Sequence, residues 1–265
     1  MFGCGNVCDR VRFGTLGADV PWSVRRPWSD LPIVECGEPL VSLEPGVRCL
    51  RPHPYASLGA PYGPGVDPFV LRRGVAERLM AAEQDLIRRD ASLRFAIFDA
   101  WRPVAVQDFM VQHAIRSECE RLGLVPEGVE DDSHHRRALE QVKRSVARFW
   151  APPSLDRSTP PPHSTGAAVD LTLADRSGSL LDMGGEIDAI GPVSEPEFYA
   201  REAASGGNRM AEIYANRRQL LVEVLTAQAF VRHPNEWWHF SFGDQLWAWS
   251  RQHTQAVYGR IDQPD

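Results

Sequence analysis

Two histidines and an aspartate, carried by two segments far apart in the chain, have side chains that commonly bind zinc. His163 and Asp170 stand seven residues apart in HSTGAAVD, and His239 follows in NEWWHF. Imidazole nitrogen and carboxylate oxygen are ordinary zinc ligands, and three protein ligands would leave one position open, as a catalytic zinc requires. A single histidine near a strand is more often a hydrogen-bonded core or surface residue. The residue types alone leave both interpretations open.

A carboxylate lies three residues before the last of these histidines. In a strand, residues three apart point to opposite faces, so Glu236 and His239 share one site only at a bend or at a strand end. Trp237 and Trp238 are typical core aromatics, but they would also desolvate Glu236. Desolvation raises a carboxyl pKa, which suits a general base.

The elements that must position these residues are visible in the hydrophobic pattern. Gly166 and Ala167 permit a tight turn, after which a strand would bring Asp170 back beside His163. Apolar runs predict strands, and three- to four-residue spacing of apolar residues predicts helices. The expected strands are 93–98, 168–173, 230–231 and 237–242, and the expected helices are 69–90, 104–122, 137–150 and 208–228. Turn-rich segments at 52–68, 126–137 and 151–162 are expected to be loops or connectors.

The length of 265 residues allows one or two domains, and no internal repeat or change of composition divides the chain. We expect one α+β domain, with a small antiparallel sheet that carries the site and several flanking helices. Residues 1–48 are rich in Gly, Pro and Trp, with weak periodicity. They are expected to form an irregular amino-terminal extension packed on a single domain at 49–265.

Composition excludes several classes of protein. The formal net charge is −6, whereas nucleic-acid-binding proteins usually carry a basic surplus. No stretch approaches the ~18 apolar residues that a membrane span needs. The amino end lacks the apolar run of a secretory signal, so we expect a cytoplasmic protein. Cys4 and Cys8 could share a metal, but no second pair has zinc-finger spacing, which favours reduced thiols.

Three segments, FDAWRP, HSTGAAVDLTL and EWWHF, resemble the zinc D-Ala-D-Ala dipeptidases of vancomycin resistance. Their superfamily also holds D-Ala-D-Ala carboxypeptidases and the amino-terminal domain of hedgehog proteins. Its hallmark is SxHxxGxAxD, followed downstream by ExxWH or a close variant. The residues that match are His163, Gly166, Ala168, Asp170, Glu236, Trp238 and His239. The likeness runs in the same order from about Tyr55 to Phe242.

The resemblance implies a role for each of these side chains. His163, Asp170 and His239 would hold one Zn²⁺ per chain, and Glu236 would take a proton from a metal-activated water and return it to the leaving amine. Arg102, in FDAWRP, would donate to the carbonyl oxygen as that oxygen gains charge. An arginine at a helix start would also pair with Asp99, and both roles can hold at once.

The resemblance assigns the substrate contacts less completely. Asp188, in LDMGGEID, matches an MGxxFD segment and would meet the ammonium of the substrate, or else would cap a turn. Tyr55 matches the tyrosine of a YATxxNF segment and would also contact substrate. Pro161 replaces the serine that opens SxHxxGxAxD, which leaves the identity of the substrate open.

The expected activity is therefore zinc-dependent hydrolysis of D-alanyl-D-alanine or a related free dipeptide, a cell-wall precursor, with neither nucleic acid nor membrane as partner. A carboxypeptidase that trims peptidoglycan stems would need export and a longer groove. The sequence is also compatible with a relative recruited to another small peptide-like metabolite, or with an inactive, zinc-stabilised binding module. The pairing of Glu236 with Arg102 argues against a binding module, which needs neither a base nor an oxyanion donor.

Overall fold

The computed structural model describes residues 25–125, 133–206 and 208–262. Cys4 and Cys8 lie outside them. Its strands are β1 (Leu40–Ser42), β2 (Arg48–Cys49), β3 (Val70–Arg72), β4 (Leu93–Asp99), β5 (Ala168–Asp175), β6 (Val231–Arg232) and β7 (His239–Ser241). Its helices are α1 (Pro54–Ser57), α2 (Arg73–Arg89), α3 (Val104–Arg121), α4 (Ser133–Phe149), α5 (Phe198–Ala204), α6 (Arg209–Ala227) and α7 (Gln245–Ser250). Short 3₁₀ turns occupy Pro162–Thr165 and Pro192–Ser194.

A five-stranded sheet in the order β2-β4-β5-β7-β6 forms the centre of the molecule, and β1 and β3 form a separate antiparallel pair. The pairs β4–β5, β5–β7 and β7–β6 are antiparallel, whereas β2 runs parallel to β4. The predicted α+β fold is confirmed, with a mixed rather than purely antiparallel sheet. No helix in the described ranges is long and apolar enough to span a membrane.

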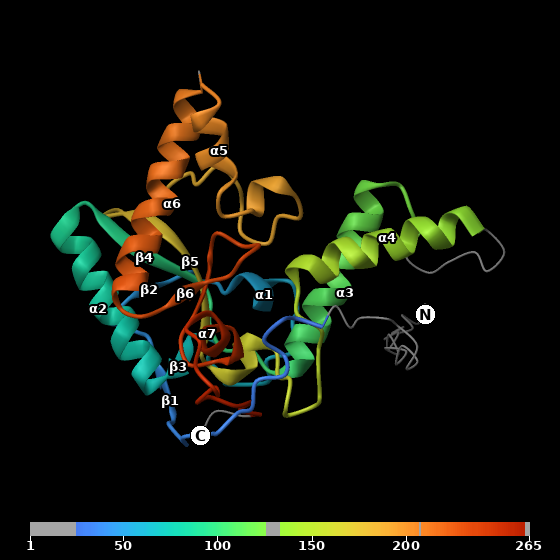
Figure 1. Ribbon diagram of the computed structural model, residues 1–265, viewed down its shortest axis with the longest axis horizontal. Coiled ribbons are helices and arrows are strands. Elements are labelled where there is room, and N and C mark those ends of the chain that lie inside the picture. The colour runs from blue at the N-terminus through green and yellow to red at the C-terminus, as the bar shows by residue number, and fades with distance from the viewer. Residues whose placement is uncertain (1–24, 126–132, 207, 263–265) are drawn as a thin grey trace, which may run out of the picture.

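The two faces of the sheet have different environments. Val169, Leu171 and Leu173 of β5 alternate into the main hydrophobic core, where α2 and α6 pack side by side (Figure 1). Because successive strand residues point to opposite faces, Asp170 and Thr172 of β5 face away from this core. The polar side chains of the site therefore project from the face opposite α2 and α6.

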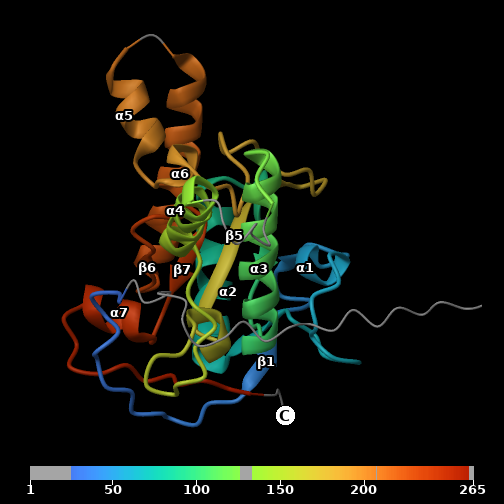
Figure 2. The ribbon, with the colours of Figure 1, turned by 90° about the vertical axis from the view of Figure 1, so that its right-hand side faces the viewer.

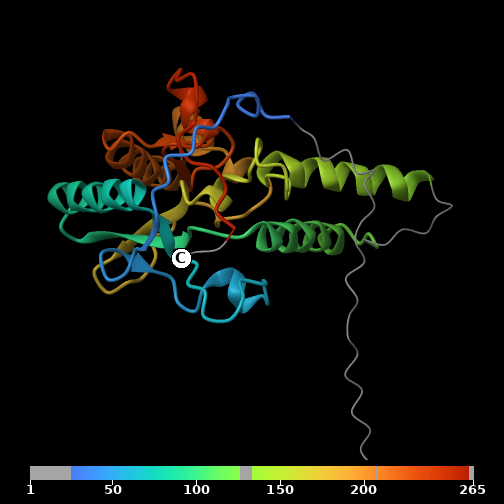
Figure 3. The same cartoon turned by 90° about the horizontal axis from the view of Figure 1, so that it is seen from below.

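Helices α3 and α4 lie side by side on the far side of the sheet from α2 (Figures 1 and 3). Their facing side chains form a second hydrophobic cluster, which includes Met110 and Val146 and continues to Tyr55 and Trp150. Helix α5 packs on the start of α6, and the two rise above the sheet (Figure 2). The second cluster places the base of α3 and α4 beside the polar face of the sheet.

Several predicted boundaries differ from the observed ones. The helix expected at 69–90 begins at Arg73, because residues 70–72 form β3 and pair with β1. Leu71 lies in this strand but packs in the same core as the apolar face of α2. Its position in the sequence therefore fits the helical spacing although it is not in the helix. Residues 133–137, expected in a loop, belong to α4, while α1, α5 and α7 are too short to show periodicity.

Candidate metal centre and its cavity

Asp170 and His239 face each other across the sheet. They are register partners in the antiparallel pair β5–β7, and both side chains are buried. The Asp170 Oδ1 lies 3.0 Å from the His239 Nδ1. Glu236 lies outside β7, which begins at His239. This is the strand-end position that the spacing of Glu236 and His239 requires.

His163 reaches the same point from the 3₁₀ turn that precedes β5. The turn ends at Gly166, which has a left-handed φ of 68°. The backbone favours glycine at this position, and a Cβ there would lie 2.4 Å from the Leu40 Cδ2, so the Leu40 side chain would have to move. The turn brings the His163 Nε2 to 3.2 Å from an Asp170 carboxylate oxygen and 3.2 Å from the His239 Nδ1.

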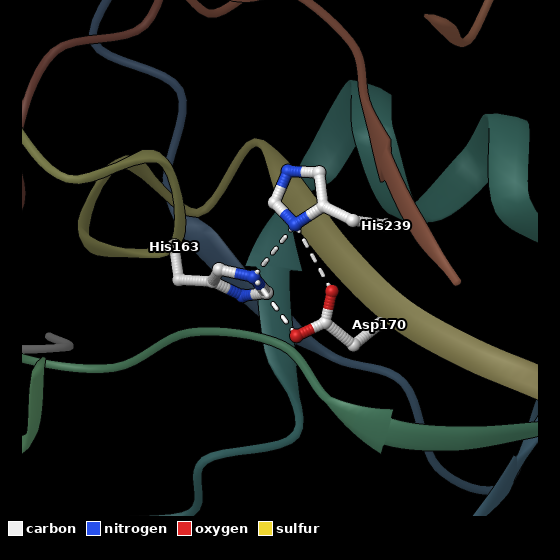
Figure 4. Close-up of side chains that lie close together, drawn as sticks. All are labelled: His163, Asp170 and His239. Atoms are coloured by element: carbon white, nitrogen blue, oxygen red, sulfur yellow. Dashed lines mark hydrogen bonds and ion pairs between the residues drawn. The ribbon is translucent and has the colours of Figure 1, made fainter. Parts of the chain in front are cut away.

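His163, Asp170 and His239, here called the metal triad, point their donor atoms at one another (Figure 4). Ligand atoms that bind zinc tetrahedrally at about 2.0–2.1 Å lie about 3.4 Å apart. The two histidine nitrogens are 3.2 Å apart, and each lies 3.0–3.2 Å from a different oxygen of the Asp170 carboxylate, separations that are close to that value. Both the donor types and their spacing fit a metal ion that keeps a fourth position for a ligand from solution.

The outer nitrogens of the two histidines are hydrogen-bonded, which fixes the rings. The His163 Nδ1 donates to the Ala100 carbonyl at 2.6 Å, and the His239 Nε2 lies 3.2 Å from the Ser241 Oγ. Protons on these outer nitrogens leave the inner ones unprotonated, as metal binding requires. Burial opposes ionisation of Asp170, but the two histidines outweigh it and hold the Asp170 pKa well below its usual range.

Glu236 stands beside the metal triad with one oxygen unsatisfied. Its Oε2 lies 3.8 Å from the His239 Nδ1, whereas its buried Oε1 accepts no hydrogen bond. Trp237 and Trp238 are both buried next to it. Burial raises the pKa of Glu236 to about 8. A carboxyl group with this pKa exchanges protons near neutral pH, as a general base and acid must.

Arg102 contacts the metal triad through Asp170. Its Nε is 2.9 Å from the Asp99 Oδ2, and its Nη2 donates to the Asp170 Oδ2 at 3.3 Å. The predicted pairing with Asp99 is thus observed. The remaining nitrogen, Nη1, is buried and has no hydrogen-bond partner. The guanidinium is held by two carboxylates and keeps one donor unpaired.

Asp99 organises a network that the sequence did not reveal. The fully buried Asp99 carboxylate lies 3.1 Å from the His53 Nε2, 3.1 Å from the Tyr62 hydroxyl and 3.2 Å from the His163 Nδ1. Despite its burial, Arg102 and the two histidines lower its pKa. Asp99 therefore stays ionised and orients Arg102 and His163 together.

Asp188 and Tyr55 form a hydrogen-bonded pair near the site. The buried Tyr55 hydroxyl donates to the Asp188 Oδ2 at 2.8 Å. Asp188 has a left-handed φ of 68°, uncommon for a residue other than glycine. Burial, reinforced by the charge of Asp170, raises the pKa of Asp188 to about 7. Asp188 has no cationic partner in the described part of the chain.

A cavity of about 730 Å³ joins these groups. The metal triad, Glu236, Arg102 and Asp188 line one part of it, whereas Tyr55 lies behind Asp188. The other walls come from residues 25–33 and from the proline-rich connector 151–162, which includes Pro161. His233 also lines the cavity, with its Nδ1 3.4 Å from the Glu236 Oε1. Neither His233 nor residues 25–33 showed a sequence signal that marked them as part of the site.

The chain is similar to known proteins over most of its length. The model of the peptidase M15 family, described as D-Ala-D-Ala dipeptidase, matches residues 48–258. The chain is 43% identical over 247 residues to a D-alanyl-D-alanine dipeptidase of Synechocystis, and the alignment covers 89% of this chain and 97% of that protein. It is 37% identical over 78 residues to a D-alanyl-D-alanine dipeptidase of Escherichia coli, covering 29% of this chain and 36% of that one.

Among solved structures, the chain is similar to a mutant of the vancomycin-resistance D,D-pentapeptidase VanY in complex with Zn(II). The TM-score is 0.39 at 14% identity, covering 85% of this chain and 96% of that one. The LD-carboxypeptidase LdcB gives a TM-score of 0.39 at 13% identity, covering 83% of this chain and 76% of that one.

Proposed function

The chain belongs to the D-Ala-D-Ala dipeptidase family of metallopeptidases, and from this membership we propose that it hydrolyses free D-alanyl-D-alanine as a zinc enzyme. The observation that carries the proposal is the convergence of three ligand atoms beside an unsatisfied carboxylate oxygen in one cavity. The metal triad supplies two nitrogens and one oxygen, a donor set that zinc accepts.

The metal would be held by the His163 Nε2, the His239 Nδ1 and the Asp170 carboxylate. The outer nitrogens of both histidines already have hydrogen-bond partners. When bound there, zinc would polarise the peptide carbonyl, acidify a water molecule and favour the ionised form of Glu236. The remaining work of the reaction falls to side chains of the protein.

Glu236 moves the proton in this proposal. Its carboxylate accepts a proton from the attacking water and passes it to the nitrogen of the departing D-alanine. Its burial and its raised pKa support this role, because the same carboxyl group must both take up and release a proton.

Arg102 stabilises the carbonyl oxygen as that oxygen gains negative charge. Its unpaired Nη1 is the donor that supports this role, and Asp99 and Asp170 prevent the guanidinium from turning away. A donor fixed in advance needs no reorganisation when the charge develops. A module that only binds ligand has no use for an unpaired donor beside a base.

Asp188 binds the ammonium of the substrate, and Tyr55 acts through Asp188. The half-buried carboxylate at the cavity wall lacks a cation, and a free dipeptide carries one on its first residue. An ion pair between Asp188 and the substrate ammonium would fix the amino end of the substrate, so that only one residue precedes the scissile bond.

A panel of free dipeptides tests the proposed function. Zinc-loaded protein is incubated with Ala-Ala in its D,D, L,D and L,L forms, and the release of alanine is followed by mass spectrometry. We expect release from the D,D dipeptide and none from the L,L form, while Glu236→Gln protein serves as the inactive control. Absence of release from D-alanyl-D-alanine would reject the proposal.

A further inference from the structure

Residues 25–33, here called the amino-terminal strap, form a wall of the cavity and precede the region that the family model matches. Besides the hydrogen bond from the Ala256 amide to the Pro32 carbonyl, two sets of side-chain hydrogen bonds tie the strap to the body. The Gln245 Nε2 donates to the carbonyls of Ser29 and Leu31, as well as to that of Ser158 in the connector. The Arg26 Nη2 donates to the carbonyls of Ala147 and Arg148 at 2.8 and 3.2 Å. These bonds fix the strap over the site.

Arg26 is a cation of the cavity wall without an acidic partner. It forms no ion pair within the parts of the chain that the structure describes, although its neighbour Arg25 pairs with Asp30. Arg102, the other arginine near the metal triad, is already held by Asp99 and Asp170. The Arg26 Nη2 donates to the two carbonyls at the end of α4, so its Nε and Nη1 are the donors available to a ligand.

Arg26 lies near the general base, because the Arg26 Nη2 and the Asn235 Nδ2 both donate to the Arg148 carbonyl and Asn235 directly precedes Glu236. Burial lowers the pKa of the Arg26 guanidinium, and the charge of Glu236 opposes that shift. The amino acid that leaves takes its proton from Glu236, and its carboxylate is separated from the accepting nitrogen by a single carbon. The carboxylate of the departing residue must therefore lie on the Glu236 side of the cavity, where Arg26 is.

We propose that Arg26 binds the carboxyl-terminal carboxylate of the dipeptide, so that the strap determines specificity for a free carboxylate. The inference rests on the proposed function, in which Asp188 takes the ammonium. The positive charge of the guanidinium and a free N–H donor on it match a carboxylate. The strap would then complete a site whose catalytic groups all lie on the main body of the chain.

The test compares D-alanyl-D-alanine with D-alanyl-D-alaninamide, which has the same scissile bond but lacks the terminal charge. Arg26→Gln keeps an amide donor for the α4 carbonyls and removes the cation. We expect it to lower the acid-to-amide ratio of kcat/KM about 10- to 100-fold, through a higher KM for the acid. Arg26→Lys, which keeps the charge but not the guanidinium donors, should give a ratio between those of wild type and Arg26→Gln.

The matched control is Arg94→Gln, because Arg94 also donates to two main-chain carbonyls, those of Ala91 and Leu93, outside the cavity. Its acid-to-amide ratio should equal that of wild type. A folded Arg26→Gln protein that retains the wild-type acid-to-amide ratio would overturn the inference about Arg26. The proposed dipeptidase function would not be affected by that result.

Binding separates this inference from the proposed function. In zinc-loaded Glu236→Gln protein, calorimetry should give a lower Kd for the acid than for the amide, and adding Arg26→Gln should abolish that difference. If wild type cleaves neither substrate, the proposed function fails. The Kd values of the acid and the amide, with and without Arg26→Gln, still decide whether Arg26 binds the carboxylate. Equal Kd values for acid and amide before Arg26 is changed would reject it.

Discussion

Asp170 of β5 and His239 of β7 are register partners, and the Asp170 Oδ1 lies 3.0 Å from the His239 Nδ1. The pairing of two strands thus places two of the three ligands of the metal triad. A shift of one residue in register would turn one of these side chains into the hydrophobic core, since side chains alternate between faces. The metal site is therefore inseparable from the register of the sheet.

Arg102 is expected to act in the transition state. Arg102→Ala should lower kcat about 10²- to 10³-fold with a much smaller change in KM, because the Nη1 donor meets charge that develops only during reaction. Steady-state kinetics with D-alanyl-D-alanine measure both constants. An unchanged kcat with weaker binding would instead make Arg102 a substrate anchor.

Asp188 is expected to reject substrates with a blocked amine. N-acetyl-D-alanyl-D-alanine has no ammonium and would bury the Asp188 carboxylate unpaired, so its kcat/KM should be at least about 100-fold below that of the free dipeptide. Asp188→Asn should reduce this difference in kcat/KM, because it impairs hydrolysis of the free dipeptide. Efficient cleavage of the acetylated peptide by wild type would refute both the role of Asp188 and the dipeptidase specificity.

The pair Tyr55–Asp188 predicts a pH dependence. Burial raises the pKa of Asp188 to about 7, and the Tyr55 hydrogen bond partly offsets this by favouring the ionised form. Activity that needs the ionised carboxylate should fall as pH falls below about 7, and Tyr55→Phe should move this limb of kcat/KM to higher pH. Tyr62→Phe, which removes a hydrogen bond to Asp99 instead, is the control. An unmoved limb in Tyr55→Phe would count against the pairing.

Gly166 is expected to be intolerant of a side chain for two reasons that can be separated. Gly59 also has a positive φ, of 88°, but an added Cβ there would meet nothing within 4 Å. Gly59→Ala should lower the free energy of unfolding by about 1–2 kcal/mol from backbone strain alone. Gly166→Ala should lower it by about 1–3 kcal/mol more, because of its contact with Leu40. Urea denaturation compares the two, and equal losses would show that Leu40 moves aside.

The sequence predicts the metal triad because each part of it lies in a short segment with a strong local pattern. His163 and Asp170 are joined by a turn whose glycine is visible in the sequence, and β5 alternates Val169, Leu171 and Leu173 with Asp170 and Thr172. Glu236 and His239 are three residues apart, which restricts them to a strand end. The resemblance to the dipeptidases then supplied roles that the residue types left open.

The rest of the site depends on contacts between distant segments, which no local pattern encodes. His53 meets Asp99 across 46 positions, and Arg26 meets the end of α4 across more than 120. Strand β3 pairs with β1 through only three residues, too few to show an alternation. Such contacts arise from the packing of the whole chain, and only the three-dimensional structure reveals them.

The most direct test measures zinc content and D-alanine release together in three purified proteins. We expect about one zinc per chain in wild type and in Glu236→Gln, because Glu236 is not a ligand in this proposal, and little zinc in His239→Ala. Only zinc-loaded wild type should release D-alanine from D-alanyl-D-alanine, and chelation should abolish that release until zinc is restored. Equal zinc in His239→Ala and wild type would contradict the assignment of His239 as a zinc ligand. Undiminished D-alanine release from the chelated protein would contradict a zinc-dependent reaction.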